Sequence, residues 1–217
     1  MAQSHLDHEE LNYINIMKIG PKYKIARRLG SPIFEKTQGP KYALSLSRKE
    51  KNMKGRNKPK SEFGKQLIEK QKARFSYGVS EKQFSKYAKA CLNAPEPMQK
   101  LFRSIELRLD NILYRAGFAK TRALGRQMAS HGHATVNGRR VTIPSMKLGV
   151  EDVVGIREGS KASALFTELE EKMKAHTLPA WLEVDSKKKE IKLIGLPVYA
   201  PGEHVFDLGA VLEFYSR

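Results

Sequence analysis

Residues 108–141, RLDNILYRAGFAKTRALGRQMASHGHATVNGRRV, carry the most regular local pattern in the chain. The spacing of apolar residues around its start predicts one amphipathic helix, through Ile105, Leu109, Ile112, Leu113 and Ala116. Gly117 is expected to end this helix, and Thr121 is expected to cap the start of a second one. One helix running from about Ile105 to Ala116 and a second one beginning after Thr121 are therefore predicted here.

The second predicted helix is followed by a hairpin signal. Gly132 should end the helix, and Asn137-Gly138 is the dipeptide preferred in two-residue type I′ hairpin turns. A further strand is expected over residues 153–157. Within the second helix Arg122 and Arg126 lie four residues apart and share one face. Gly125 between them costs helix stability relative to alanine, and the sequence supplies no reason for it.

The whole chain is basic. It has 217 residues, with 40 Lys and Arg against 23 Asp and Glu, a net charge of +17, and 40% hydrophobic residues. That apolar content supports a folded core, and no apolar run approaches the roughly 18 residues of a membrane-spanning helix. The charge calls for a polyanionic partner: a polyphosphate backbone, an anionic membrane surface or an acidic protein.

The cysteine count and the first residues narrow the class further. The single cysteine, Cys91, excludes an internal disulfide and any multi-cysteine zinc site, and it suits a reducing cytoplasm. Its position on a predicted helix favours a small core residue. The acidic start MAQSHLDHEELNYINI has neither the basic nor the apolar region of a signal peptide.

The charge is concentrated in one part of the chain. Residues 1–16 carry −3, residues 17–91 carry +16, residues 92–160 carry +5 and residues 161–217 carry −1. Residues 17–61 are rich in Gly, Pro and Lys with interleaved aromatic residues, so we expect an arm that becomes ordered on its partner; the alternative is a solvated linker. Two helices should follow, beginning after Ser61 and Ser80. On the first of them Phe63, Leu67 and Phe75 are expected to form the apolar side.

Several stretches resemble the S4 family of small-subunit ribosomal proteins. Residues 108–141 resemble the RNA-binding module that this family shares with several RNA-modifying enzymes. The bacterial form of the family is indicated by MKIGPKYKIARRLG at 17–30, SEFGKQLIEKQKARFSYGVSEKQF at 61–84, PAWLEVD at 179–185 and VLEFYSR at 211–217. The similarity keeps order and spacing over about residues 17–217.

The resemblance implies an α+β fold with two domains. A mostly helical N-terminal domain with extended basic arms would occupy residues 17–105, and a small α/β RNA-binding domain of two helices and a short antiparallel sheet would occupy 106–165. Residues 166–217 would pack back on the N-terminal domain. Separately, the apolar spacing predicts a helix over 163–176, across this boundary. Residues 1–16 would be a disordered extension.

The resemblance also implies a function. The protein would be a structural constituent of the small ribosomal subunit in the cytoplasm. It would be a primary binder of 16S-type ribosomal RNA (rRNA) at a multi-helix junction and would nucleate assembly there. In the finished subunit it would lie near the messenger RNA entry channel, beside neighbours such as protein S5, and would affect the accuracy of translation. Two alternatives stay open: an RNA-modifying enzyme and a free messenger-binding repressor. Against the enzyme, Arg108-Leu109-Asp110 resembles the Arg-Leu-Asp of pseudouridine synthases but opens a helix, where Asp110 would support structure by pairing with an arginine.

No cofactor is expected. Many bacterial relatives hold zinc with cysteines in the N-terminal arm, whereas residues 17–61 here contain neither cysteine nor histidine. The resemblance therefore implies a zinc-free form. His131 and His133 form only a weak metal pattern, and His131 is expected to contact RNA.

The expected RNA contacts are spread over both domains, because A-form RNA is recognised mainly through its shape, phosphates and 2′-hydroxyl groups. In the module they are Arg108, Lys120, Thr121, Arg122, Arg126, Gln127, Ser130, His131, Asn137, Arg139 and Arg140. In the N-terminal domain they are Lys22, Lys24, Arg27, Arg28, Arg48, Lys54, Arg56, Lys65, Lys70, Lys72 and Arg74.

Overall fold

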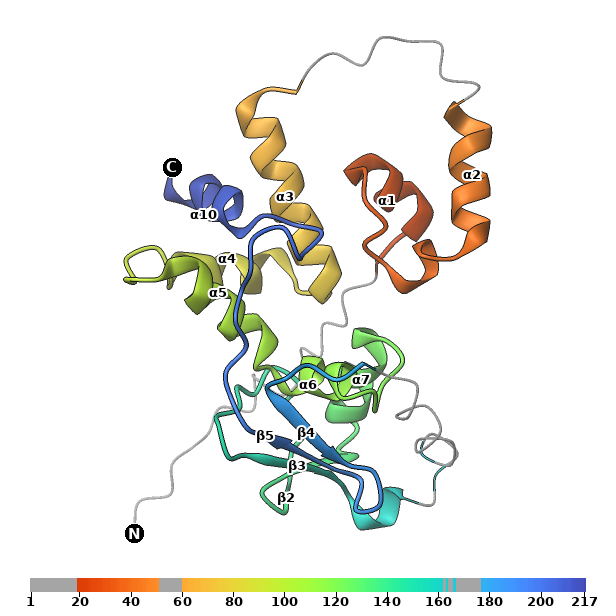
Figure 1. The fold of residues 1–217 in the computed structure, drawn as a ribbon, viewed down its shortest axis with the longest axis vertical. Helices are drawn as coiled ribbons and strands as arrows, with labels where there is room; N and C mark the ends of the chain where they lie inside the picture. Colours follow the sequence, from red (N-terminus) through yellow and green to blue (C-terminus); the bar gives the residue numbers. More distant parts are fainter. Residues whose placement is uncertain (1–18, 51–59, 162, 164–165, 167–176) are drawn as a thin grey trace.

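The computed structural model describes residues 19–50, 60–161, 163, 166 and 177–217. Two bodies lie one above the other in Figure 1. We call residues 19–106 with 199–217 the helical lobe, and residues 107–193 the module. Among the helices of these ranges, none has the length and hydrophobicity of a bilayer-spanning segment.

The elements of the helical lobe are helices throughout: α1 (Lys22–Leu29), the short 3₁₀ helix η2 (Glu35–Thr37), α2 (Pro40–Glu50), α3 (Glu62–Tyr77), α4 (Glu81–Lys89), α5 (Pro97–Glu106) and α10 (Leu208–Ser216). The module contains α6 (Leu109–Arg115), α7 (Arg122–Ser130) and the 3₁₀ helix η3 (Glu158–Ser160). Its strands are β1 (Ala134–Val136), β2 (Arg139–Arg140), β3 (Val153–Ile156), β4 (Leu182–Asp185) and β5 (Glu190–Leu193). The α+β architecture predicted from the sequence is confirmed.

The basic N-terminal segment is helical over its described part, which corrects the expectation of an arm without a core. Its aromatic residues Tyr23, Phe34 and Tyr42 pack with Ala26 and Leu29 in a small core, to which α3 adds partly buried side chains. Tyr23 and Tyr42 have ring centroids 5.3 Å apart. From the sequence, these aromatic residues among the basic ones favoured an arm that becomes ordered on a partner. They instead bury each other, which stabilises helices too short to persist alone.

Helices α3 and α4 begin as predicted. The hydroxyl oxygens of Ser61 and Ser80 accept hydrogen bonds from backbone N–H groups three residues on, and Gly78 ends α3 with φ of 61°. The expected apolar side of α3 was wrong, because Phe63 is half exposed and the buried face is formed by Gln66, Lys70, Ala73 and Tyr77. This face packs against α10, so the C-terminal helix dictates which side of α3 is covered.

One long helix was expected through Ile105 and Leu109, and the structure divides it into α5 and α6. Arg108 is extended, with φ of −73° and ψ of 140°. Neighbouring backbone groups pair instead with a distant loop: Leu109 donates to the Met146 carbonyl at 2.9 Å, and Leu148 donates to the Leu107 carbonyl at 2.9 Å. These bonds replace the helical bonds that the break removes. Both short helices keep their apolar residues in register, which explains why they resemble one.

Helices α6 and α7 pack tightly, and Gly125 explains how. A Cβ at this position would overlap the backbone carbonyl of Asp110 on α6. Glycine therefore lets the two helix backbones approach more closely than any side chain allows. The predicted cap is confirmed, since the Thr121 hydroxyl oxygen accepts a 3.1 Å bond from the N–H of Leu124.

The sheet is antiparallel throughout, in the order β2-β1-β3-β5-β4. The predicted type I′ turn is confirmed by the positive φ of Asn137 (50°) and Gly138 (78°) between β1 and β2. Strands β4 and β5 were expected to pack on the N-terminal domain. They belong to the module instead, because β5 pairs with β3, and Ile191 and Leu193 are buried in its core.

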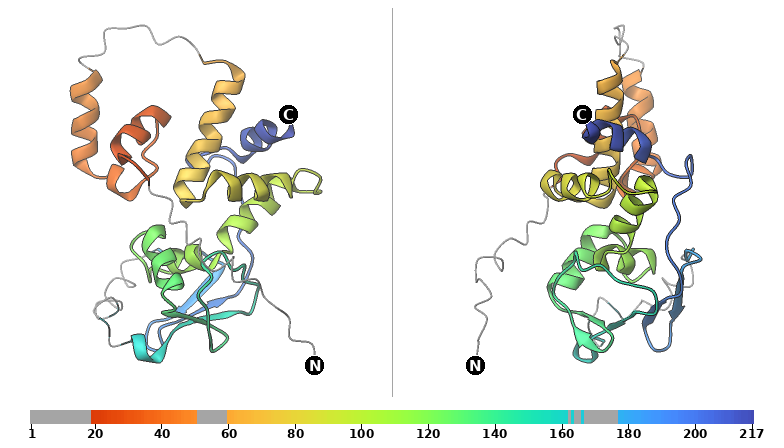
Figure 2. Two further views of the ribbon diagram at one scale, coloured as in Figure 1. Left: turned by 180° about the vertical axis from the view of Figure 1, so that it is seen from behind. Right: turned by 90° about the vertical axis from the view of Figure 1, so that its left-hand side faces the viewer.

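The chain after β5 returns to the helical lobe, as the two views of Figure 2 show. There Tyr199, Phe206, Leu208, Val211 and Leu212 join the core formed by α3, α4 and α5. Cys91 is buried in the same core, as expected. Residues 166–217 therefore divide between the two bodies. The helix expected over 163–176 lies outside the described residues except at Ser163 and Phe166.

The close approach at Gly125 predicts that Gly125→Ala destabilises the protein, by about 1–3 kcal/mol for an overpacked site. Thermal unfolding of the full chain followed by circular dichroism measures this. Gly159→Ala is the matched control, since Gly159 lies in the same module and nothing stands within 4 Å of its added Cβ. Equal melting temperatures for the two variants would contradict the packing argument.

Candidate nucleic-acid interface

A buried carboxylate, Glu106 at the end of α5, organises the junction between the helical lobe and the module. Only 1% of Glu106 is exposed. It accepts hydrogen bonds from the Tyr77 hydroxyl at 2.6 Å, from Nδ2 of Asn111 at 2.6 Å and from Nε of Arg115 at 2.9 Å. The donors come from α3 and α6, so this carboxylate joins the two bodies.

A second buried carboxylate, Asp110, lies one residue into α6. Arg108 binds it through two nitrogens, at 3.0 and 2.7 Å, and Nε of Arg126 binds it at 2.8 Å. Arg126 also donates to the backbone carbonyls of Tyr77 and Gly78 at the end of α3. Arg108 donates to the Tyr87 hydroxyl of α4 at 2.9 Å. Arginines of the module therefore hold the helical lobe.

Arg122 completes this junction. Its Nε donates to Oδ1 of Asn111 at 2.7 Å, and its guanidinium lies 4.7 Å from the ring centroid of Tyr77 and 4.4 Å from that of Tyr114. A guanidinium between two aromatic rings gains cation–π attraction from both. Its position therefore has a structural cause inside the protein.

These contacts give three of the predicted RNA-binding arginines partners inside the protein. Arg108 is 3% exposed, and the Arg126 side chain is 12% exposed. Together with Arg122, which is partly exposed, they were predicted to bind RNA, and this stays a prediction; within the protein their guanidinium groups contact groups between the helical lobe and the module. The expectation that Asp110 pairs with an arginine is confirmed.

On helix α3, three predicted RNA contacts also have partners inside the protein. Lys70 is buried, pairs with Glu81 at 2.8 Å and has its Nζ 4.4 Å from the Phe214 ring centroid of α10. Lys72 pairs with Glu69 at 2.7 Å, and Arg74 lies 3.4 Å from Glu81. Lys70 and Arg74 connect α3 to neighbouring helices, whereas Lys72 pairs within α3 itself, although helical spacing alone suggests an open basic face. The charge pattern did not reveal that α10 would cover it.

The remaining predicted residues are more accessible. Exposed are Lys120, Gln127, His131, Asn137, Arg139 and Arg140 of the module, and Lys24, Arg28, Arg48 and Lys65 of the helical lobe; partly exposed are Lys22, Arg27, Thr121 and Ser130. Asn137 uses its side chain within the module, donating to Asp152 and accepting from the N–H of Val153. Lys54 and Arg56 lie outside the described residues.

A hollow of about 400 Å³ beside β2 contains cations that the sequence did not indicate. Arg157, Lys161 and Lys188 line it together with Arg140, and Glu158 and Glu190 contribute two acidic groups. Residue 188 comes from the β4–β5 turn. Because the pairing of β3 with β5 was not foreseen, no local pattern could have placed this lysine near the β1–β2 hairpin.

The histidine pair has contacts of its own. The rings of His131 and His133 have centroids 6.0 Å apart, and Nδ1 of His133 lies 3.0 Å from the Ser160 hydroxyl. Over the described ranges, no three His, Cys, Asp or Glu side chains gather as metal ligands.

The electrostatics of the junction favour its charged form. Burial opposes ionisation of Glu106, but the hydrogen bond and positive charge of Arg115 outweigh it, and the pKa of that carboxyl falls to about 2. Burial likewise opposes charging of Arg115, yet Glu106 raises the pKa of its guanidinium. Burial and the negative charge of Glu106 raise the pKa of Tyr77 well above its ordinary value. Tyr77 therefore remains a hydrogen-bond donor to an ionised carboxylate.

Comparison with known proteins gives two family matches in chain order. Residues 17–104 match the ribosomal protein S4/S9 N-terminal domain, and residues 107–154 match the S4 domain. Proteins named small ribosomal subunit protein uS4 are similar over most of the chain. The one from Amoebophilus asiaticus is 40% identical over 92% of this chain and 98% of its own, and the one from Roseiflexus castenholzii is 38% identical over the same shares. The one from Mycobacterium avium is 42% identical over 72% of this chain and 79% of its own.

The depressed pKa of Glu106 predicts an acid-sensitive junction. Because the folded-state pKa is about 2 and the ordinary value is 4.5, the ionised carboxylate stabilises the fold above pH 4.5, and this contribution is lost as the pH falls through about 2. The loss should be on the order of 3 kcal/mol. Urea unfolding at pH 7, 4.5, 3 and 2 measures it.

Glu106→Gln should lower stability at pH 7 by about 3–5 kcal/mol, as for a broken buried ion pair, and should flatten the dependence between pH 4.5 and 2. Glu96→Gln, which changes an exposed carboxylate before α5, is the matched control and should follow the wild-type curve. A Glu106→Gln curve parallel to the wild type would show that the pH dependence has another source.

Proposed function

This chain belongs to the S4 family of small-subunit ribosomal proteins, and on that basis we propose that it binds 16S-type rRNA as a structural constituent of the small subunit. The observation that carries the proposal is the similarity to uS4 proteins across both bodies of the fold, over 92% of the chain. We place the protein in the cytoplasm, as part of the subunit.

The distribution of charge supports this proposal. After the internal arginines are set aside, exposed cations remain on α1 and α2 and around the β1–β2 hairpin. They lie on two bodies that the Glu106 and Asp110 contacts hold together. Two basic surfaces at a fixed separation suit recognition by shape, since an RNA junction presents phosphates from several helices in one arrangement.

We further propose the finer role that the resemblance implies. The protein binds early at a multi-helix junction and nucleates assembly there. It then lies near the messenger entry channel, contacts neighbouring proteins such as S5 and influences accuracy. A rigid junction supports this role, because a protein that holds RNA helices at set angles must itself resist bending.

The alternative of an RNA-modifying enzyme receives no support from Asp110. A catalytic aspartate must reach the RNA, whereas this one is 1% exposed and is bound by Arg108 and Arg126. A free messenger-binding repressor would use the same exposed cations and could coexist with the ribosomal role.

The exposed hairpin predicts where RNA affinity resides. Arg139→Glu combined with Arg140→Glu should weaken binding to purified small-subunit rRNA more than tenfold without changing the melting temperature. The slope of the logarithm of affinity against the logarithm of salt concentration should become shallower by about one for each lost phosphate contact. Filter binding at several salt concentrations measures both quantities.

The control is Lys82→Glu with Lys86→Glu, which reverses two exposed charges on α4. Charge reversal at Arg122 and Arg126 is not equivalent, because it removes contacts within the protein and should lower the melting temperature. Unchanged affinity of the hairpin variant at moderate salt would remove the hairpin from the RNA surface.

The ribosomal role itself predicts that the endogenous protein co-sediments with the small subunit. Sucrose-gradient fractions prepared in high salt and probed by immunoblot should show it there, since a primary rRNA binder stays attached when loosely held proteins wash off. The matched control is the same lysate treated with ribonuclease, which should move the protein to the light fractions. Recovery only in light fractions without that treatment would contradict the proposed function.

A further inference from the structure

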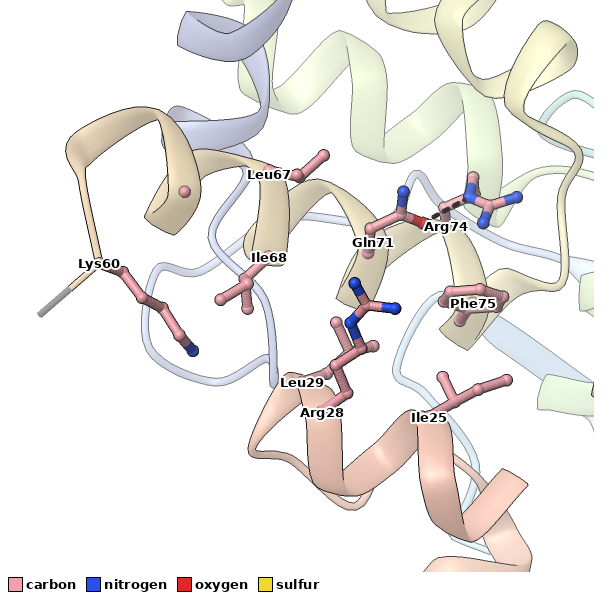
Figure 3. A pocket seen from close by; sticks show the side chains of 10 residues that line it. Ile25, Arg28, Leu29, Lys60, Leu67, Ile68, Gln71, Arg74 and Phe75 are labelled. Carbon is pink, nitrogen blue, oxygen red and sulfur yellow. Dashed lines mark hydrogen bonds between the residues drawn. The ribbon is translucent and has the colours of Figure 1, made fainter. Parts of the chain in front are cut away.

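A groove of about 440 Å³ lies between α1 and α3 in the helical lobe. Figure 3 shows Ile25, Arg28 and Leu29 of α1 facing the side chains of α3. The predicted RNA contacts included Arg28 and Arg74 but not a cavity. The groove contributes nothing to the junction between the two bodies.

The floor of the groove is apolar and its rim is basic. Leu29, Ile68 and Phe75 belong to or pack against the small core of the N-terminal helices, so they form a fixed surface. The rim carries Arg28 and Lys60, both exposed, and no carboxylate is among the ten lining residues. An occupant should therefore combine an apolar body with negative charge at its edge.

Arg74 gives the groove a flat polar wall. Its guanidinium lies 4.3 Å from the Phe75 ring centroid, and it is held in place by Oε1 of Gln71 at 2.9 Å and by Glu81. An arginine plane is one of the surfaces on which unstacked bases stack. The wall is thus formed before any ligand arrives.

We propose that this groove receives one unstacked nucleobase of the bound RNA, with the flanking phosphates on Arg28 and Lys60. The inference rests on the proposed RNA-binding function and adds a base-insertion site to it. A nucleobase has flat apolar faces and carries its charge on the adjoining phosphates, which matches an apolar slot with a cationic rim.

The charge around the groove favours RNA over a short acidic peptide. Exposed cations continue beyond it at Lys24, Lys41, Arg48 and Lys65. A polymer with a charge on every unit can satisfy this whole surface. Residues 1–16 of the chain, with three acidic groups and several apolar residues, are the competing occupant and are included in the test.

The experiment uses the full chain with two RNA probes. One is a twelve-nucleotide oligouridylate, and the other is the same strand with abasic sites at alternate positions, so that the phosphates are equal in number. We expect at least fivefold tighter binding of the intact strand, from base stacking. Equal affinity for the two strands would overturn the proposal without using any variant.

Three variants locate the effect. Ile68→Gln makes the floor polar without changing charge and should reduce the preference for the intact strand below about twofold. Ile194→Gln, on an exposed isoleucine outside the groove, should keep the full preference. Arg28→Gln should weaken binding to both strands by the same factor. An unchanged preference in a folded Ile68→Gln variant would place the base elsewhere and overturn the site.

Hydrogen exchange of α1 and α3 in RNA-free protein tests the competing occupant. If protection there is the same with and without residues 1–16, the groove is open to RNA. Loss of protection on deletion would assign the groove to the acidic segment and overturn the proposal. If the protein binds both strands equally but still binds small-subunit rRNA, only the base site is refuted and the proposed function stands. If the protein fails to bind that rRNA, the proposed function itself is refuted.

Discussion

Two buried carboxylates, Glu106 and Asp110, determine how the helical lobe and the module are joined. Each is almost fully enclosed. Glu106 accepts from Tyr77 of the helical lobe and from Arg115 of the module, whereas Asp110 is bound by two module arginines that themselves donate to groups of the helical lobe. A buried charge that loses its partner is far more costly than an exposed one, so neither body can move away without leaving a carboxylate uncompensated. Only with this junction fixed do the exposed basic surfaces keep a constant separation.

Local signals in the sequence predicted local structure well. Caps at Ser61, Ser80 and Thr121 and the Asn137-Gly138 turn each depend on a few neighbouring residues, and the structure confirms all four. The break between α5 and α6 was missed because its cause is a loop some forty residues later in the chain. The pairing of β5 with β3 was missed for the same reason. Gly125 could be explained only once the Asp110 carbonyl stood beside it.

The candidate site shows the limit of arguments from charge. The arginines with the strongest pattern in the sequence, Arg122 and Arg126, contact other parts of the protein, whereas Arg139 and Arg140 in the simpler hairpin are exposed. A charge total from the sequence does not distinguish cations that neutralise buried carboxylates from cations that are exposed to a partner. Several cations therefore lie away from the surface beside buried carboxylates, and the exposed positive charge is more localised than the sequence suggests.

The position of α10 has a consequence for synthesis. Its residues Leu208, Val211 and Leu212 complete the core of a lobe whose other helices are made early, before the module. While the chain is being translated, α3, α4 and α5 lack their covering partner, and Lys70 lacks the aromatic rings of Phe214 and Tyr215. All five strands of the module precede α10 in the chain, so the module can fold before the helical lobe is complete. The helices made first must therefore wait for α10, and nascent chains that stop short of α10 should expose an apolar face to chaperones and proteases.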